Sequence, residues 1–487
     1  MTYAARSRAQ SGIENPSLRG RISAAGERSV SIGGVLIKTV LVASFYAVAT
    51  VGTPGVLFAI GVTFALLAMR GAVYPLVASL LLMLLVVSNS LIVDRPVNFS
   101  LVRIVFFAAF VMRAFLNEFP KLNVSQKAAL RSISSCFLFI FSIFLVTSLA
   151  GGYYFHISFF KLVQFLSILM ALLVFVFRVG RKIETIKEWI LAALVAVLLG
   201  SWAILFVNPA LGYKLHEPTN TLLFQGLINQ PQSLAVFLSM FAIFAFQLIT
   251  SRARYMPLVV LLSILAVLAM LWMTRSRTGA LGLVGILSAV YVLGAIGVNV
   301  FEKAKSGRRV GSASYFTLIA LALAGVVFIF LFADPAVISG LLERILKWSK
   351  DSGGLNLDNI ISSRVSVIDE SWSEFLKSPL IGIGFGVERS DDFIASATLF
   401  SAPSEKSFWP TAVLHETGVL GLVSFLAFVT SLISFGVNNN RNYFVVMIVA
   451  FLVFNFGEFN FFSLGSIGYF CWFLILSTVP NPIPSRG

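Results

Sequence analysis

Residues 186–207 read IKEWILAALVAVLLGSWAILFV, and from Trp189 onward this stretch contains no charged side chain. An apolar run of about 20 residues is the length at which an α-helix spans the hydrocarbon core of a bilayer. Comparable runs recur along nearly the whole chain of 487 residues, which is 58% hydrophobic and only 12% charged. Because a soluble domain cannot bury that much apolar surface, the sequence predicts an all-α polytopic membrane protein.

The apolar runs predict about 12–14 transmembrane helices and one large loop outside the membrane. The second run is short, so it can be re-entrant or tilted. The candidate spans cover residues 35–51, 55–69, 71–93, 97–116, 132–150, 157–177, 186–207, 231–249, 256–274, 279–300, 314–333, 411–435, 442–458 and 461–479.

Polar segments divide the chain into five parts. Residues 1–34 are rich in Ser, Gly, Ala and Arg and predict a disordered basic cytoplasmic tail. Residues 35–333 and 408–479 carry the predicted transmembrane helices, and residues 480–487 form a second cytoplasmic tail. Between the two helical parts, residues 334–407 are the longest polar segment after the N-terminus. We expect a loop domain there.

The net charge of +15 is explained by topology rather than by a nucleic-acid partner. Lys and Arg gather in short connections such as residues 178–187 and 303–309, whereas the connection at 151–154 has none. Basic residues concentrate in the cytoplasmic loops of membrane proteins. One orientation satisfies this rule, with both termini in the cytoplasm. The loop at 334–407 then lies in the periplasm.

The sequence indicates no metal site and no cofactor. Cys136 and Cys471 both lie in apolar spans, and His156, His216 and His415 are far apart without the spacing of metal ligands. The chain also lacks the G-x-x-x-x-G-K-[ST] sequence that cradles nucleotide phosphates, so we do not expect it to consume ATP.

Arg275 and Arg277 depart from the charge distribution because they end a predicted span on its outer side. Charges at membrane depth cost a few kcal/mol, so a compensating partner is expected. Two cations separated by one residue, in the sequence TRSRTG at 274–279, suit a phosphate or diphosphate group. The alternative is that both side chains extend to lipid headgroups, as basic residues at helix ends commonly do.

Arg103 and Lys161 are also predicted on the outer side. Arg103 is a candidate substrate-binding residue, and the alternative is an ion pair with Asp94 or Glu118. For Lys161, which lies just inside the end of its span, extension of the side chain to the lipid headgroups is the favoured interpretation.

Three motifs follow one another on the predicted outer side. The first is TRSRTG at 274–279. The second is Arg364 followed by SPLIGIGFG at 378–386, and the third is ETGVLG at 416–421. In order and spacing they resemble the O-antigen ligase and O-antigen polymerase superfamily of bacterial envelope membrane proteins. The resemblance covers roughly residues 220–435.

The resemblance implies a metal-independent glycosyltransferase in the bacterial inner membrane with a periplasmic active site. Such enzymes move a glycan from an undecaprenyl-diphosphate carrier to an acceptor. Preorganised cations stabilise the negative charge that grows on the leaving diphosphate. The implied catalytic candidates are Arg275, Arg277 and Arg364, and Glu405 is the carboxylate best placed by sequence to act as a general base.

The candidate substrate-binding residues are Gly382, Gly384, Gly386, Arg103, His415 and Glu416. The glycines would let backbone amides approach a phosphate or a sugar closely. A tight loop turn is the alternative explanation for them.

One departure from the family pattern favours a particular reaction. The ligases place a His-Asn pair about nine residues before the Glu of the ETGVLG-type motif, and here that position falls near Ser407 without a histidine. The sequence therefore predicts a polymerase that joins undecaprenyl-diphosphate-linked repeat units. A ligase acting on lipid A core or protein, and a flippase of the lipid-linked unit, are the alternatives. The expected partners are the lipid bilayer, the glycan donor and acceptor, a chain-length regulator and export machinery.

Overall fold

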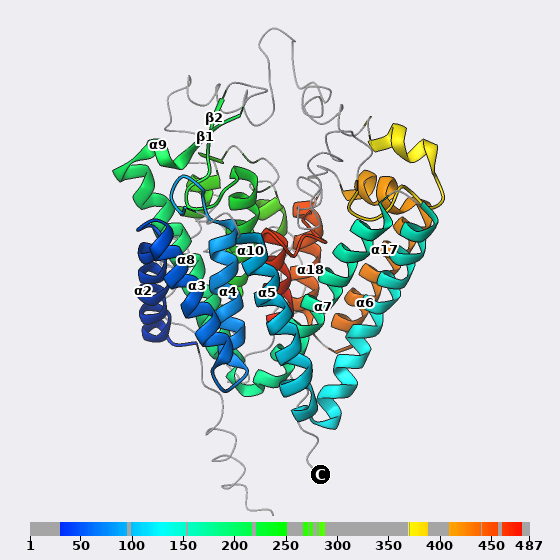
Figure 1. Ribbon diagram of the computed structural model, residues 1–487, viewed down its shortest axis with the longest axis horizontal. Coiled ribbons are helices and arrows are strands. Elements are labelled where there is room, and N and C mark those ends of the chain that lie inside the picture. The colour runs from blue at the N-terminus through cyan, green and yellow to red at the C-terminus, as the bar shows by residue number, and fades with distance from the viewer. Residues whose placement is uncertain are drawn as a thin grey trace, which may run out of the picture.

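The computed structural model describes residues 30–94, 99–151, 154–216, 221–250, 266–271, 273–274, 276, 279, 282–287, 369, 371–387, 409–439, 441–455 and 460–479. Nearly all of these residues are helical (Figure 1). The long helices are α2 (Ile32–Ala49), α3 (Thr53–Ala68), α4 (Val73–Val87), α5 (Phe99–Arg113), α6 (Val124–Gly151), α7 (Phe155–Val179), α8 (Ile183–Val207), α10 (Pro231–Thr250), α17 (Trp409–Asn438), α18 (Asn442–Asn455) and α19 (Ile467–Ser477).

Short elements connect these helices. α5 continues through a π-helical turn (Ala114–Glu118) and a 3-10 turn (Phe119–Lys121), and a second 3-10 turn (Gly180–Lys182) joins α7 to α8. The short helix α9 (Pro209–Gly212) leads into an antiparallel hairpin of β1 (Tyr213–His216) and β2 (Thr221–Phe224), in which Tyr213 faces Phe224.

The predicted class, an all-α polytopic membrane protein, is confirmed. Six described helices are long and apolar enough to cross a membrane: α2, the continuous helix Phe99–Lys121, α6, α7, α8 and α17. Five further apolar helices are shorter, namely Thr53–Ala68, Val73–Val87, Pro231–Ala245, Asn442–Asn455 and Ile467–Ser477.

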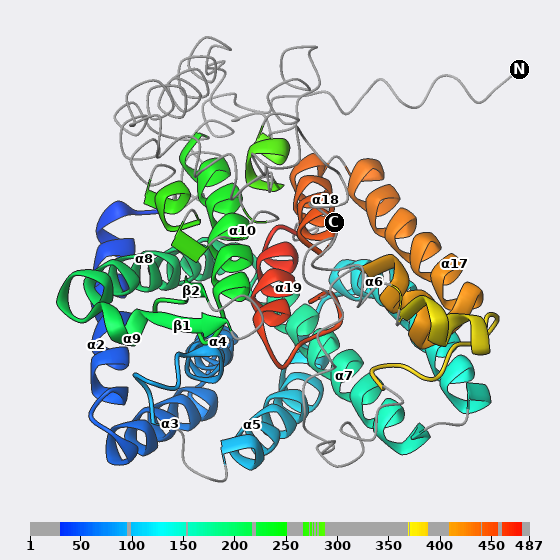
Figure 2. The ribbon, with the colours of Figure 1, turned by 90° about the horizontal axis from the view of Figure 1, so that it is seen from above.

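Helix α19 forms the centre of the described bundle (Figure 2). All of its residues are buried, which is the expected position for a helix that is apolar on every side. Trp472 fills the middle of the packing, with ring centroids 5.4 Å from Phe137 and 5.0 Å from Phe461. Its indole N–H donates to the carbonyl of Phe461 at 2.7 Å, so the one polar atom of this large side chain is satisfied.

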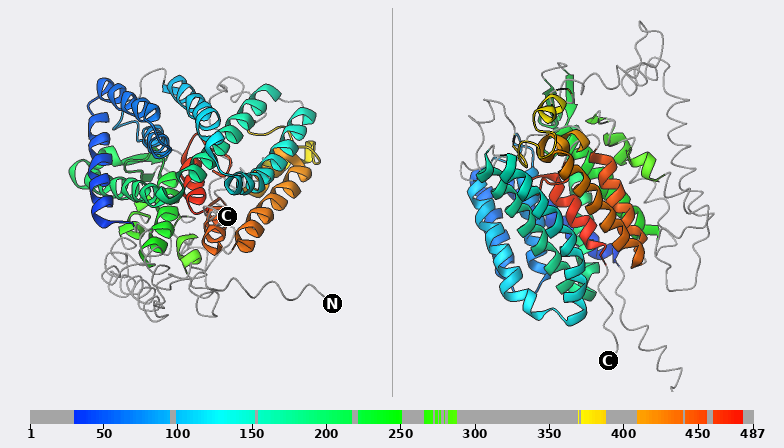
Figure 3. Two further views of the ribbon diagram at one scale, coloured as in Figure 1. Left: turned by 90° about the horizontal axis from the view of Figure 1, so that it is seen from below. Right: turned by 90° about the vertical axis from the view of Figure 1, so that its right-hand side faces the viewer.

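The two ends of the bundle differ in what they carry. At one end lie the α6–α7 connection, the β-hairpin, the start of α17 and residues 371–387 (Figures 1 and 3). We call this the loop end. At the opposite end α7 passes into α8, where Arg178 pairs with the buried carboxylate of Glu118 at 3.2 Å. Lys38 pairs there with Glu188 between α2 and α8.

The last predicted span starts later in the structure than the sequence indicates, and other predicted spans lie wholly or partly outside the described residues. The span at 461–479 begins as a helix only at Ile467, because residues 460–466 form turns. Of the spans at 256–274 and 279–300 only a part is described, and the span at 314–333 lies outside the described residues.

Most of the predicted tails and of the predicted loop lies outside the described residues. Residues 1–29 and 480–487 lie outside the described residues, and α2 begins slightly before the predicted boundary. Within the predicted loop at 334–407, the structure describes residue 369 and residues 371–387. This stretch contains a short helix over 371–377 followed by turns.

Candidate functional site

Residues 378–387, which we call the glycine run, are joined to the first turns of α17 by main-chain hydrogen bonds. The amide of Ile383 donates to the carbonyl of His415 at 3.1 Å, and the amide of Gly384 donates to the carbonyl of Glu416 at 2.9 Å. The SPLIGIGFG and ETGVLG motifs, about 30 residues apart in sequence, therefore form one structural unit.

A second pair of bonds runs in the other direction. The amide of Val419 donates to the carbonyl of Pro379 at 2.9 Å, and that of Leu420 donates to Leu380 at 3.2 Å. Between the two pairs lies Gly418, where α17 leaves helical geometry with φ 65° and ψ −166°. The kink frees main-chain groups that would otherwise bond within the helix. The glycine run forms hydrogen bonds with these groups instead.

Glycine is required where these two segments touch. A Cβ atom on Gly382 (φ +66°) would lie 2.4 Å from the carbonyl carbon of Glu416. A Cβ atom on Gly418 would lie 2.3 Å from the carbonyl carbon of Leu380. Both approaches are to backbone, which cannot move aside without breaking the hydrogen bonds. The motif glycines thus permit close contact between two backbones.

The backbone amides of residues 382–386 all donate to acceptors within the protein. The amide of Phe385 donates to Ser148 Oγ at 3.0 Å, and that of Gly386 donates to Glu416 Oε2 at 2.9 Å. Gly382 donates to the Ser378 carbonyl at 2.9 Å, and the amides of Ile383 and Gly384 bond to α17 as described above. In this arrangement Gly382, Gly384 and Gly386 serve packing, in agreement with the tight-turn alternative, and present no amide to a substrate phosphate.

Gly386 is held by two charged side chains. Lys161 of α7 donates from Nζ to the Gly386 carbonyl at 2.6 Å, while Glu416 of α17 accepts from the Gly386 amide. Lys161 is only 6% exposed and Glu416 only 3%. The favoured interpretation of Lys161, extension to the lipid headgroups, is therefore wrong. Its side chain turns inward because the glycine run offers it an acceptor.

The glycine run rests on the ends of α6 and α7. Phe385 packs between Phe144 and Phe462, with ring centroids 5.4 and 5.5 Å away. A Cβ atom on Gly151, the last residue of α6, would lie 3.0 Å from the Gly382 carbonyl. These contacts place the glycine run over the aromatic core, against α6 and the turns before α19.

Arg103 of α5 lies close to residues 460–466, the turns that also carry Phe462. Its Nη1 lies 3.3 Å from the carbonyl of Gly465, in the turns that precede α19. The predicted alternative partner Glu118 lies near the other end of the continuous helix Phe99–Lys121, about 22 Å away at 1.5 Å per residue. Asp94 accepts from Thr53 Oγ1 at 2.7 Å. The pairing of Arg103 with Glu118 is thus excluded by helix geometry.

The TRSRTG motif is described at Thr274, Ser276 and Gly279. The carbonyl of Gly279 accepts from Ser239 Oγ at 3.2 Å, and its Cβ would lie 2.8 Å from Ala235 Cβ. Both contacts are with the first turns of α10, which begins at the loop end. The motif therefore lies at the same end of the bundle as the glycine run. Four predicted catalytic residues lie outside the described residues: Arg275, Arg277, Arg364 and Glu405.

His415 is buried at the start of α17, where its carbonyl binds the glycine run. Sequence reasoning singled out neither Ser148 nor the inward role of Lys161. A basic residue inside an apolar span was the available signal for Lys161, whereas Ser148 is one of many serines in membrane helices and carries no signal of its own.

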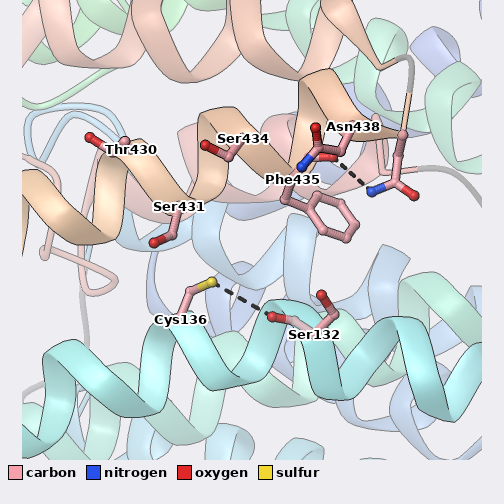
Figure 4. Close-up of a pocket in the computed structure, with 8 residues that line it drawn as sticks. Ser132, Cys136, Thr430, Ser431, Ser434, Phe435 and Asn438 are labelled. Carbon is pink, nitrogen blue, oxygen red and sulfur yellow. Dashed lines mark hydrogen bonds between the residues drawn. The ribbon is translucent and has the colours of Figure 1, made fainter.

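A recess of about 350 Å³ lies between α6 and α17 toward the opposite end (Figure 4). No charged side chain lines it. Its hydroxyls and amides partly bond to their own helices, as Asn439 does to the Phe435 carbonyl at 2.8 Å. Because its lining offers no cation, carboxylate or imidazole, it is not the candidate site. It is lined by Ser132, Cys136, Thr430, Ser431, Ser434, Phe435, Asn438 and Asn439.

The described residues contain no group of three His, Cys, Asp or Glu side chains that could hold a metal ion. The candidate site is the loop end around the glycine run, where Arg103, Lys161, His415 and Glu416 lie. A scan against protein-family models finds no match to this chain, and a search of curated proteins finds none either.

Proposed function

We propose that the protein is a polysaccharide polymerase that joins undecaprenyl-diphosphate-linked repeat units at the periplasmic face of the bacterial inner membrane. The observation that carries this proposal is the joining of the SPLIGIGFG and ETGVLG motifs into one unit at the loop end. The TRSRTG motif borders α10 at that same end. Three motifs that resemble those of one superfamily thus share one side of the bundle.

The distribution of charge supports the proposed orientation. Among the described residues, Arg70, Lys121, Arg131, Arg178, Lys182 and Arg441 belong to connections or helix ends at the opposite end of the bundle. Basic residues favour the cytoplasmic side. The loop end then faces the periplasm, where lipid-linked repeat units are available after they have been flipped across the membrane.

The proposed reaction transfers the glycan from its carrier to a sugar hydroxyl. The hydroxyl oxygen forms a bond to the anomeric carbon, and the bond from that carbon to the diphosphate oxygen breaks. The diphosphate leaves with the electron pair, and the hydroxyl proton passes to a base, for which Glu405 is the candidate. Arg275, Arg277 and Arg364 stabilise the charge that develops on the diphosphate, without a metal ion.

An exposed aromatic side chain at the loop end fits a glycan substrate. Trp372 is 47% exposed on the short helix before the glycine run, with its ring centroid 5.1 Å from that of Phe375. The apolar face of an indole can stack on a sugar ring. The contact with Phe375 agrees with the alternative role of Trp372, which is packing within this stretch.

The purified full-length protein in liposomes is expected to convert lipid-diphosphate-linked repeat units into long chains and free carrier diphosphate. Because cations of the protein replace a metal, the rate should be unchanged by an excess of EDTA. Electrophoresis of the glycans and chromatography of the released lipid measure the products. Release of single repeat units to water would contradict a polymerase. Transfer only to lipid A core would indicate the ligase, and translocation without chemistry would indicate the flippase.

A further inference from the structure

Both main-chain polar groups of Gly386, its carbonyl and its amide, form hydrogen bonds with ionisable side chains. The two side chains are of opposite sign and come from two helices. Lys161 Nζ donates to its carbonyl at 2.6 Å, and Glu416 Oε2 accepts from its amide at 2.9 Å. The aliphatic stem of Lys161 also lies against the glycine, since a Cβ atom there would be 2.9 Å from Lys161 Cδ. The φ of Gly386 is +67°, so no other residue fits this position without strain.

Forming these two hydrogen bonds with charged side chains carries a cost in desolvation free energy. Burial of an ammonium or a carboxylate carries a large desolvation cost, whereas a glutamine could donate or accept at either position. Hydrogen bonds to charged groups are about twice as strong as neutral ones. The arrangement therefore fixes this point of the chain strongly.

Gly386 is the last glycine of the run and precedes the segment that leads to α17. Val387 packs with Ile157 and Ile383 in a small apolar cluster of its own. Along the chain, Arg364 lies before the glycine run and Glu405 after it. The two hydrogen bonds to Gly386 thus hold the end of the described stretch 371–387, which the sequence places between these two candidate groups.

We infer that Lys161 and Glu416 form a latch on Gly386 and act as positioning residues for glycosyl transfer. This inference rests on the proposed function. The latch holds the glycine run against α6, α7 and α17. Glu416 acts here through Gly386, in place of the direct substrate contact that the sequence suggested.

Hydrogen exchange in the full-length protein tests the latch without reference to activity. Lys161→Met keeps the aliphatic stem and removes the ammonium, and it is expected to raise amide exchange in residues 383–386 by at least about 10-fold. Glu416→Gln should act on the same amides. The matched control is Lys377→Met, because Lys377 forms an exposed pair with Glu374 just before the glycine run. Unchanged exchange in Lys161→Met would overturn the latch.

Kinetics in liposomes test the positioning role. Lys161→Met is expected to lower kcat for chain formation at least about 10-fold with KM within about twofold. The double variant Lys161→Met/Glu416→Gln removes both charges, so its melting temperature should recover relative to either single variant. Its kcat should stay low. Recovery of kcat together with stability would overturn the positioning role, since a structural contribution alone would then explain both.

The proposed function and the latch are contradicted by different experimental results. A wild-type protein that forms no polymer contradicts the proposed function, while the exchange experiment still decides whether the latch exists. A wild-type protein that polymerises, with Lys161→Met exchanging and polymerising at the wild-type rate, contradicts the latch and leaves the proposed function intact.

Discussion

Gly418→Ala is expected to lower the free energy of unfolding by at least about 3 kcal/mol, or to prevent folding in the membrane altogether. Gly418 has φ 65° and ψ −166°, a backbone conformation that is essentially restricted to glycine. The added Cβ would lie 2.3 Å from the carbonyl carbon of Leu380 and 2.4 Å from its oxygen. Relief of this clash would separate the glycine run from α17 and break the hydrogen bonds on both sides of the kink.

Thermal unfolding of the purified protein in detergent measures this effect. The matched control is Gly61→Ala in α3, where the added Cβ would meet no atom within 4 Å and the backbone is helical. Alanine is favoured over glycine inside a helix by about 1 kcal/mol, so Gly61→Ala should be neutral or slightly stabilising. Equal melting temperatures for Gly418→Ala and the wild type would contradict the interlocked unit.

Arg275→Ala is expected to lower kcat for chain formation by about 10²–10³-fold, the usual cost of removing one group that stabilises transition-state charge. The neighbouring Thr274 and Ser276 lie at the loop end, where Thr274 Oγ1 accepts from the Ser276 amide at 3.3 Å. Arg275→Lys keeps the charge but loses the planar fork that binds two phosphate oxygens at once, so it should recover the rate only in part.

Arg70→Ala provides the matched control, because Arg70 is an exposed arginine in the α3–α4 connection at the opposite end. Its kcat should equal that of the wild type. Initial rates with a lipid-diphosphate-linked repeat unit at saturating concentration measure the effect. Full activity of Arg275→Ala at normal protein levels would remove Arg275 from the site.

The fold class could be predicted because bilayer crossing leaves a signal in each helix separately. Every apolar run of the required length predicts a span, and α2, α6, α7, α8 and α17 each match one. The start of α19 could not be predicted in this way. Residues 460–466 read NFFSLGS, and the apolar members of this stretch extended the predicted span to 461, yet the residues form turns in which the Phe461 carbonyl accepts from the Trp472 indole.

The candidate site was predictable only as separate motifs. The sequence indicated SPLIGIGFG and ETGVLG, but the hydrogen bonds between them join backbones, and backbone atoms are the same in every residue. Lys161 shows the same limit. Its burial depends on Gly386, which is 225 positions away in the chain. No local pattern around Lys161 contains that information.

The glycan profile of a strain that lacks this chain shows whether the protein forms the polymer. A polymerase predicts accumulation of single repeat units on the lipid carrier, with long chains restored when the wild-type protein is supplied. Long polymer that persists on its carrier in the deletion strain would contradict the claim, because chain formation would then proceed without this protein.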